Sequence, residues 1–205
     1  YGLIQRYSNR NRLKLLSTAL PTTREDDPAD QETLPVMDVE ERIESGGHLE
    51  ELYSLAEKFY QGDGQTEDLE KALNLFTNAA EKGHAGAQLR LGAMYNNGEG
   101  VEVDEGKAFH WISISASKGD NEAVNYLGRL YDEGWGVPVN KEKAVECYAK
   151  AAKNGYADAQ NNLANALYSG QGIAEDEKEA LYWAQKSVEQ GCEEAKALLI
   201  ILEDS

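Results

Sequence analysis

Apolar side chains follow a helical spacing in the first dozen residues of a 36-residue block that occurs four times along the chain. The blocks span residues 49–84, 85–120, 121–156 and 157–192. In the second and third blocks the apolar positions are Ala87, Leu91, Met94 and Tyr95, and Ala123, Leu127, Leu130 and Tyr131. A period of about 3.6 residues predicts a helix with one buried face at the start of each block.

Two glycines, one residue apart, divide each block. The pairs begin at Gly62, Gly98, Gly134 and Gly170. Glycine readily takes the left-handed conformation that closes a helix. Six residues later stands a side chain that can cap a new helix: Asp68, Asp104, Asn140 or Asp176. Such a glycine pair can also hold a phosphate, but a phosphate loop should follow a strand, which nothing here indicates.

The second half of each block predicts a second helix. It ends at a further glycine, which is Gly83, Gly119, Gly155 or Gly191. One helix pair cannot cover its own apolar stripe, so adjacent pairs must stack. Ala56, Gly92, Gly128 and Ala164 share one position, where a small side chain lets a neighbouring helix approach. We therefore predict an all-α fold, a right-handed α-α superhelix (solenoid) of antiparallel helix pairs.

The same register continues beyond the four blocks. Residues 36–48 match the second helix of a preceding unit, and residues 193–205 match the first helix of a fifth. We expect these half-repeats to cap a solenoid that covers residues 36–205. Residues 21–35, with three prolines and an acidic run, predict a linker. Residues 1–20 form a basic N-terminal arm.

Charge narrows the possible partners. A net charge of −17 disfavours nucleic acid and favours basic protein segments. No apolar run is long enough to predict a transmembrane helix. The arm contains arginine but no acid, as mitochondrial transit segments do, so we expect an intracellular and mitochondrial protein. Alternatively, the arm docks on a partner, or it is a folded helix without targeting meaning.

The segments LGAMYNNGEGVEVDEGKAFHWISISASKG and LGRLYDEGWGVPVNKEKAVECYAKAAKNG resemble Sel1-like repeats, relatives of the tetratricopeptide family. All four blocks share the resemblance, although Gln65 in the first replaces the usual apolar residue after the glycines. The resemblance implies a non-catalytic scaffold that assembles protein complexes. Some cysteine-rich members carry a cysteine pair in each repeat, but Cys147 and Cys192 do not occupy equivalent positions.

Nothing in the sequence indicates catalysis, a cofactor or a metal site. His48 and His84 share one repeat position but lack a recurring third ligand, so we interpret them as solvated loop residues. Cys147 is expected in the core, because it aligns with Leu75 and two tryptophans, and Cys192 is expected to be exposed. We expect no enzyme; the alternative is an enzyme with a cryptic site in the groove.

The first helices should line a concave groove if the array curves like its tetratricopeptide relatives. Positions 5, 9, 12 and 13 of each block would then face a partner. The candidate residues at these positions are Glu57, Tyr60, Asn96, Asn97, Asn125, Arg129, Asp132, Glu133, Asn161, Asn165 and Tyr168. Amides can pair with a peptide backbone, and carboxylates attract lysine or arginine. The alternative is that these are only solvated polar positions.

Trp135 is a separate candidate. Its counterparts are Asp63, Glu99 and Gln171, so the repeat does not require an aromatic residue there. We expect Trp135 to anchor an interface, with local packing against Pro138 or a neighbouring turn as the alternative. Together these features predict a scaffold or adaptor, an accessory subunit of a hetero-oligomeric complex. In the alternative, the basic arm docks and the solenoid is a spacer.

Overall fold

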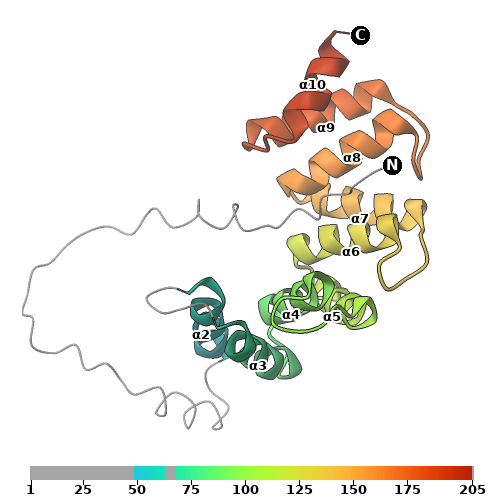
Figure 1. The fold of residues 1–205 in the computed structure, drawn as a ribbon. Helices are drawn as coiled ribbons and strands as arrows, with labels where there is room; N and C mark the ends of the chain where they lie inside the picture. Colours follow the sequence, from blue (N-terminus) through green and yellow to red (C-terminus); the bar gives the residue numbers. More distant parts are fainter. Residues whose placement is uncertain (1–48, 63–67, 205) are drawn as a thin grey trace, which may run out of the picture. The chain divides into compact units, whose positions relative to one another are not determined.

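The computed structural model describes residues 49–62 and 68–204 (Figure 1). These residues contain α-helices and no strand. The helices are α2 (Leu49–Gln61), α3 (Leu69–Glu81), α4 (Ala85–Asn97), α5 (Glu105–Ser117), α6 (Asn121–Glu133), α7 (Lys141–Lys153), α8 (Ala157–Ser169), α9 (Glu177–Glu189) and α10 (Ala195–Glu203). The predicted arm, linker and half-repeat at residues 1–20, 21–35 and 36–48 lie outside the described residues.

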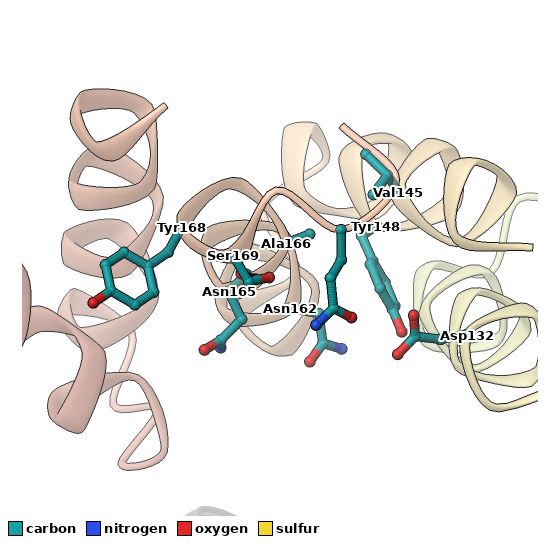
Figure 2. A pocket seen from close by; sticks show the side chains of 9 residues that line it. Asp132, Val145, Tyr148, Asn162, Asn165, Ala166, Tyr168 and Ser169 are labelled. Atoms are coloured by element: carbon teal, nitrogen blue, oxygen red, sulfur yellow. Dashed lines mark hydrogen bonds between the residues drawn. The ribbon is translucent and has the colours of Figure 1, made fainter. Parts of the chain in front are cut away.

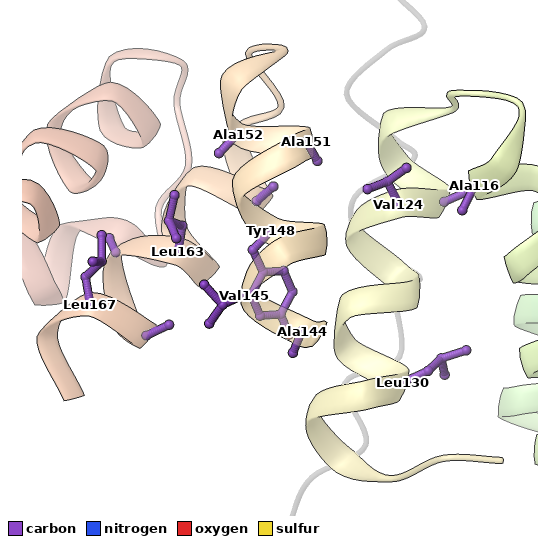
Figure 3. Packing of buried hydrophobic residues seen from close by; sticks show 14 of the residues in the cluster. Ala116, Val124, Leu130, Ala144, Val145, Tyr148, Ala151, Ala152, Leu163 and Leu167 are labelled. Carbon is purple, nitrogen blue, oxygen red and sulfur yellow. The ribbon is translucent and has the colours of Figure 1, made fainter. Parts of the chain in front are cut away.

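The helices stack in chain order. Each helix packs against the helix before it and the helix after it, from α2 through α10. Their buried side chains form a core that is shared between repeats: Leu130, Tyr148 and Leu163 come from three consecutive helices and belong to one cluster (Figure 3). The prediction of an all-α solenoid is confirmed, and its right-handedness stays a prediction.

The helix ends lie where the glycine and Asx positions predict them. Gly98, Gly134 and Gly170 are left-handed C-caps with φ of 72°, 79° and 67°. Asp68, Asp104, Asn140 and Asp176 are N-caps that each accept a hydrogen bond from the backbone N–H three residues on. The bond from the Lys107 N–H lowers the pKa of Asp104.

The second glycine of the last three pairs has a role that the sequence did not reveal. Gly136 touches the backbone of Glu105, and Gly172 touches that of Lys141. Gly100 makes the same approach to Leu69. Each contacted residue is the first of a second helix in the preceding repeat. The loop of one repeat therefore rests on the previous repeat, backbone against backbone, and a side chain would separate them.

A shared small residue lets the two helices of a repeat meet. A Cβ at Gly92 would stand 2.5 Å from Ile112 Cγ1, and one at Gly128 would stand 2.6 Å from Tyr148 Cε1. Ala56 and Ala164, at the same position, are fully buried. In α10 this position holds Ile200, which is 60% exposed.

Two interpretations of single residues were wrong. His84 is not a solvated loop histidine: its Nδ1 accepts from the Ala87 N–H as the N-cap of α4, and its ring stacks on Tyr53 at 4.5 Å. His48 lies outside the described residues. Cys192 is not exposed but buried, at 3% exposure. Cys147 is half-buried and packs against the core, close to expectation.

Candidate protein-binding surface

The first helices of successive repeats are joined by polar side chains. Arg90 Nε of α4 donates to Glu57 Oε1 of α2 at 2.8 Å. Asn96 Nδ2 of α4 donates to the Tyr126 hydroxyl of α6 at 3.2 Å. Asn162 Nδ2 of α8 donates to Asn125 Oδ1 of α6 at 2.9 Å. The sides of α2, α4, α6 and α8 that carry the candidate residues are called here the first-helix face.

Four of the predicted contact residues are hydrogen-bonded to a residue of a neighbouring repeat. Glu57, Asn96 and Asn125 make the bonds just described, and the Tyr60 hydroxyl donates to Glu99 Oε2 at 2.6 Å. Burial and this bond raise the pKa of Tyr60. Although burial lowers the pKa of Arg90, the nearby Glu57 carboxylate raises it above its ordinary value. These residues hold one repeat against the next.

Asn125 corrects the expectation of an open polar position. It is 6% exposed, because the neighbouring α8 covers it and supplies Asn162 as its partner. The expected contact of Asn125 with a partner backbone is therefore replaced by a contact inside the array.

Trp135 packs locally. It is half-buried against the core, and the Arg129 guanidinium lies over its ring at 5.8 Å and over the Tyr126 ring at 5.4 Å. The two rings hold Arg129 in place, and no ion pair is present for it among the residues that the structure describes. Anchoring of a partner by Trp135 stays a prediction.

The other candidates lie further out. Asn97, Glu133, Asn165 and Tyr168 are exposed, and Asn161 is half-exposed. Asp132 forms an ion pair with Lys141, Oδ1 to Nζ at 2.8 Å. The exposed side chains therefore gather at the C-terminal ends of the first helices, on α4, α6 and α8.

A pocket of about 340 Å³ opens at the junction of α6, α7 and α8 (Figure 2). We call it the junction pocket. Its lining residues are Asp132, Val145, Tyr148, Asn162, Asn165, Ala166, Tyr168, Ser169 and Gln171. Four of them, Asp132, Asn165, Tyr168 and Ser169, stand at repeat positions that the sequence predicted to face a partner. Ala166 and Val145 give the pocket an apolar part, and the remaining residues surround it with oxygen and nitrogen atoms.

Tyr148 is the least expected member of the pocket. It is 5% exposed, and its ring points toward the Asp132 carboxylate (Figure 2). Burial raises the pKa of Tyr148, and the Asp132 charge raises it further. Among the described residues, none accepts or donates a hydrogen bond at this hydroxyl. Phe76 fills the equivalent position in the first repeat without a hydroxyl, so packing does not require one.

The junction pocket forms where the residues of one repeat junction differ from those at the equivalent positions of another. At the first junction, Tyr60 and Glu99 occupy the positions equivalent to Asp132 and Gln171, and they are hydrogen-bonded to each other. At the third junction a shorter Asp132 leaves room, and it bonds to Lys141 instead. The sequence contains one indication of this pocket, because the repeat position that holds Tyr60 in the first block holds Asp132 in the third. That change indicates a pocket only when it is considered together with the residue that faces it in the next block, Glu99 or Gln171.

No group of three or more His, Cys, Asp or Glu side chains that could hold a metal ion occurs within 49–62 and 68–204. No helix in the same ranges is both long and apolar enough to cross a membrane.

Comparison with known proteins identifies the repeat. The model of the Sel1 repeat matches residues 52–84, 85–120, 121–156 and 157–192. The chain belongs to the Sel1 repeat family. Sel1 repeat proteins are generally protein-interaction scaffolds and are typically not catalytic. Among curated proteins, none matches the chain.

Solved Sel1 structures share the fold. A Sel1 repeat protein from Oxalobacter formigenes is 29% identical, with a TM-score of 0.74 over 80% of this chain and 63% of that one. The protective antigen c5321 of uropathogenic Escherichia coli, which has an SLR fold, is 35% identical, with a TM-score of 0.70 over 76% and 33%. Cysteine-rich protein B of Helicobacter pylori is 26% identical, with a TM-score of 0.51 over 65% and 96%. The chain thus spans less than two thirds of the first two relatives.

Proposed function

We propose that this Sel1 repeat chain is an adaptor, an accessory subunit that holds a segment of another protein on the first-helix face of α4, α6 and α8. The observation that carries the proposal is the junction pocket, which is lined by a nearly buried tyrosine whose hydroxyl has no partner among the described residues. That hydroxyl is open to the pocket, where a polar group of a partner can reach it.

The distribution of engaged and exposed side chains supports this location. At the α2 end, Glu57 and Tyr60 are held by Arg90 and Glu99. Toward α6 and α8, Asn165 and Tyr168 are exposed and line the junction pocket, and Glu133 is exposed at the end of α6. Partner contact is therefore concentrated in the second half of the array, where polar groups can pair with an extended backbone.

Capture of a partner with matched variants tests the proposal. The first variant carries Asn97→Ala, Glu133→Ala and Tyr168→Ala, all exposed on first helices. The control carries Asn74→Ala, Glu146→Ala and Tyr182→Ala, which remove the same side-chain types from exposed sites on second helices. We expect a protein retained by the wild type and the control to be reduced at least about tenfold on the first variant. Equal retention by both variants would contradict the proposal.

A further inference from the structure

We propose that the junction pocket binds an arginine side chain of the partner segment. This inference rests on the proposed function and names the chemistry that the first-helix face selects. It depends on which atoms line the pocket and on which of them are already engaged.

The amide side chains present acceptor atoms to the pocket. Asn165 Nδ2 donates to the Asn161 carbonyl oxygen at 2.8 Å and to Asn161 Oδ1 at 3.1 Å. A backbone carbonyl only accepts, which fixes the orientation of the Asn165 amide. Asn162 Nδ2 is likewise engaged, by Asn125. Both amides therefore keep their Oδ1 atoms as acceptors, and a ligand rich in N–H donors complements them.

The pocket also carries negative charge. Asp132 is the one charged residue in its lining, and its Oδ1 forms an ion pair with Lys141 Nζ at 2.8 Å. An ionised carboxylate has about four lone-pair sites, so it can accept from a second cation. Two cations stand nearby, but Lys141 is paired with Asp132, and Arg129 is stacked on Tyr126 and Trp135. Neither lines the pocket.

The shape of the pocket favours arginine over lysine. Val145, Ala166 and the Tyr148 ring can cover the methylene stem of a long basic side chain. The acceptors come from Asp132 on α6, Tyr148 on α7, and Asn162 and Asn165 on α8, so they are spread around the pocket. A planar guanidinium has five donors in a fixed fork and reaches several separate acceptors at once, whereas an ammonium is a single point.

Tyr148 supplies a further hydrogen-bond acceptor in the junction pocket. Its hydroxyl oxygen is open to the pocket and has no hydrogen-bond partner among the described residues, so it can accept from a guanidinium N–H. This bond contributes more to the binding free energy than a bond from a mobile side chain would. The core already holds Tyr148 in place, so binding does not have to restrict its rotamers.

An NMR titration tests the inference with a defined probe, N-acetyl-glycyl-arginyl-glycinamide. We expect saturable shifts of the side-chain amide signals of Asn162 and Asn165. Asp132→Asn should weaken binding at least about tenfold and Tyr148→Phe about threefold, because each removes an acceptor for a charged donor. Glu146→Gln is the matched control for charge, since Glu146 is exposed on α7 outside the lining, and it should bind as the wild type does.

The same peptide with citrulline in place of arginine keeps the shape but loses the charge, and it should bind at least about tenfold more weakly. Equal affinity for the citrulline peptide, or unchanged affinity in Asp132→Asn, would overturn the inference. A captured partner that the Asp132→Asn and Tyr148→Phe variants retain at full affinity would overturn it while leaving the adaptor function standing. Saturable arginine binding without any captured partner would overturn the adaptor function alone.

Discussion

The backbone of Gly136 lies against the backbone of Glu105 in the preceding repeat, and no side chain comes between them. Gly172 and Lys141 make the same contact one repeat later. These contacts fix how far one helix pair can shift along the next, because two backbones in van der Waals contact tolerate little adjustment. The position of the first helices, and with it the junction pocket, depends on this register.

Gly136→Ala should therefore destabilise the array strongly. The substitution adds a side chain at φ of +69° and drives it into the Glu105 carbonyl. We expect a loss of about 3 kcal/mol or more in the free energy of unfolding, measured by urea denaturation with circular dichroism.

Gly119→Ala separates the cost of backbone strain from the cost of the clash with Glu105. Gly119 has φ of +89°, but a Cβ there would meet nothing within 4 Å, so only backbone strain is added. Its expected cost is about 1 kcal/mol. If both variants lose the same stability, the close approach to Glu105 contributes nothing.

The contact between the two helices of a repeat is testable in the same way. Gly92→Ala should cost about 1–3 kcal/mol through overpacking against Ile112, and Ile112→Ala about 2–5 kcal/mol through a cavity. The double variant recreates the pair of Ala164 and Ala184 that the fourth repeat uses, and both of these are fully buried. Thermal denaturation should show that the double variant loses at least about 1 kcal/mol less than the sum of the singles. Simple additivity would contradict the contact.

Low pH should weaken the helix N-cap that Asp104 forms and so lower the stability of the fold. The Lys107 backbone N–H lowers the pKa of Asp104 in the folded state. The stabilisation by Asp104 is therefore complete above its unfolded pKa, about 3.9, and it is lost as the pH falls through the folded pKa. Asp104→Asn keeps the cap, as Asn140 does with the Lys143 N–H at 2.8 Å, but it cannot titrate. Between pH 5 and pH 2, as a rough range, its stability should fall less than that of the wild type.

The comparison with Asp104→Ala serves as the control for that experiment. Alanine removes the cap at every pH, so its loss of stability relative to the wild type should be present at neutral pH and should shrink in acid. An identical pH dependence in the wild type and Asp104→Asn would show that the ionised carboxylate adds nothing.

The sequence predicted the helices well because their ends are determined locally. A left-handed turn needs glycine, and an N-cap needs a short oxygen-bearing side chain, so Gly98 and Asp104 mark one boundary by themselves. The contact between Gly136 and Glu105 could not be predicted, because it joins two backbones 31 residues apart and the second glycine does not identify its neighbour.

The candidate surface was predicted only in part, for a related reason. Helical spacing placed Asn125 and Tyr168 on the same face but did not show that Asn162 of the next repeat covers Asn125. Tyr148 lies at the same repeat position as Phe76 and is buried as Phe76 is, yet its hydroxyl reaches the junction pocket. The ring of a long side chain can be buried while its end group remains accessible. A hydrophobic pattern in the sequence marks the whole residue as either buried or exposed and cannot show both.

Site-specific photo-crosslinking tests the central claim most directly, that the first-helix face of α4, α6 and α8 holds the partner segment. A photoreactive phenylalanine replaces either Tyr168 on α8 or Tyr182 on α9, which are 38% and 51% exposed. With the captured partner present, we expect crosslinks from position 168 to one continuous partner segment that contains arginine, and few from position 182. Equal crosslinking from both positions, or crosslinking from position 182 alone, would contradict the account.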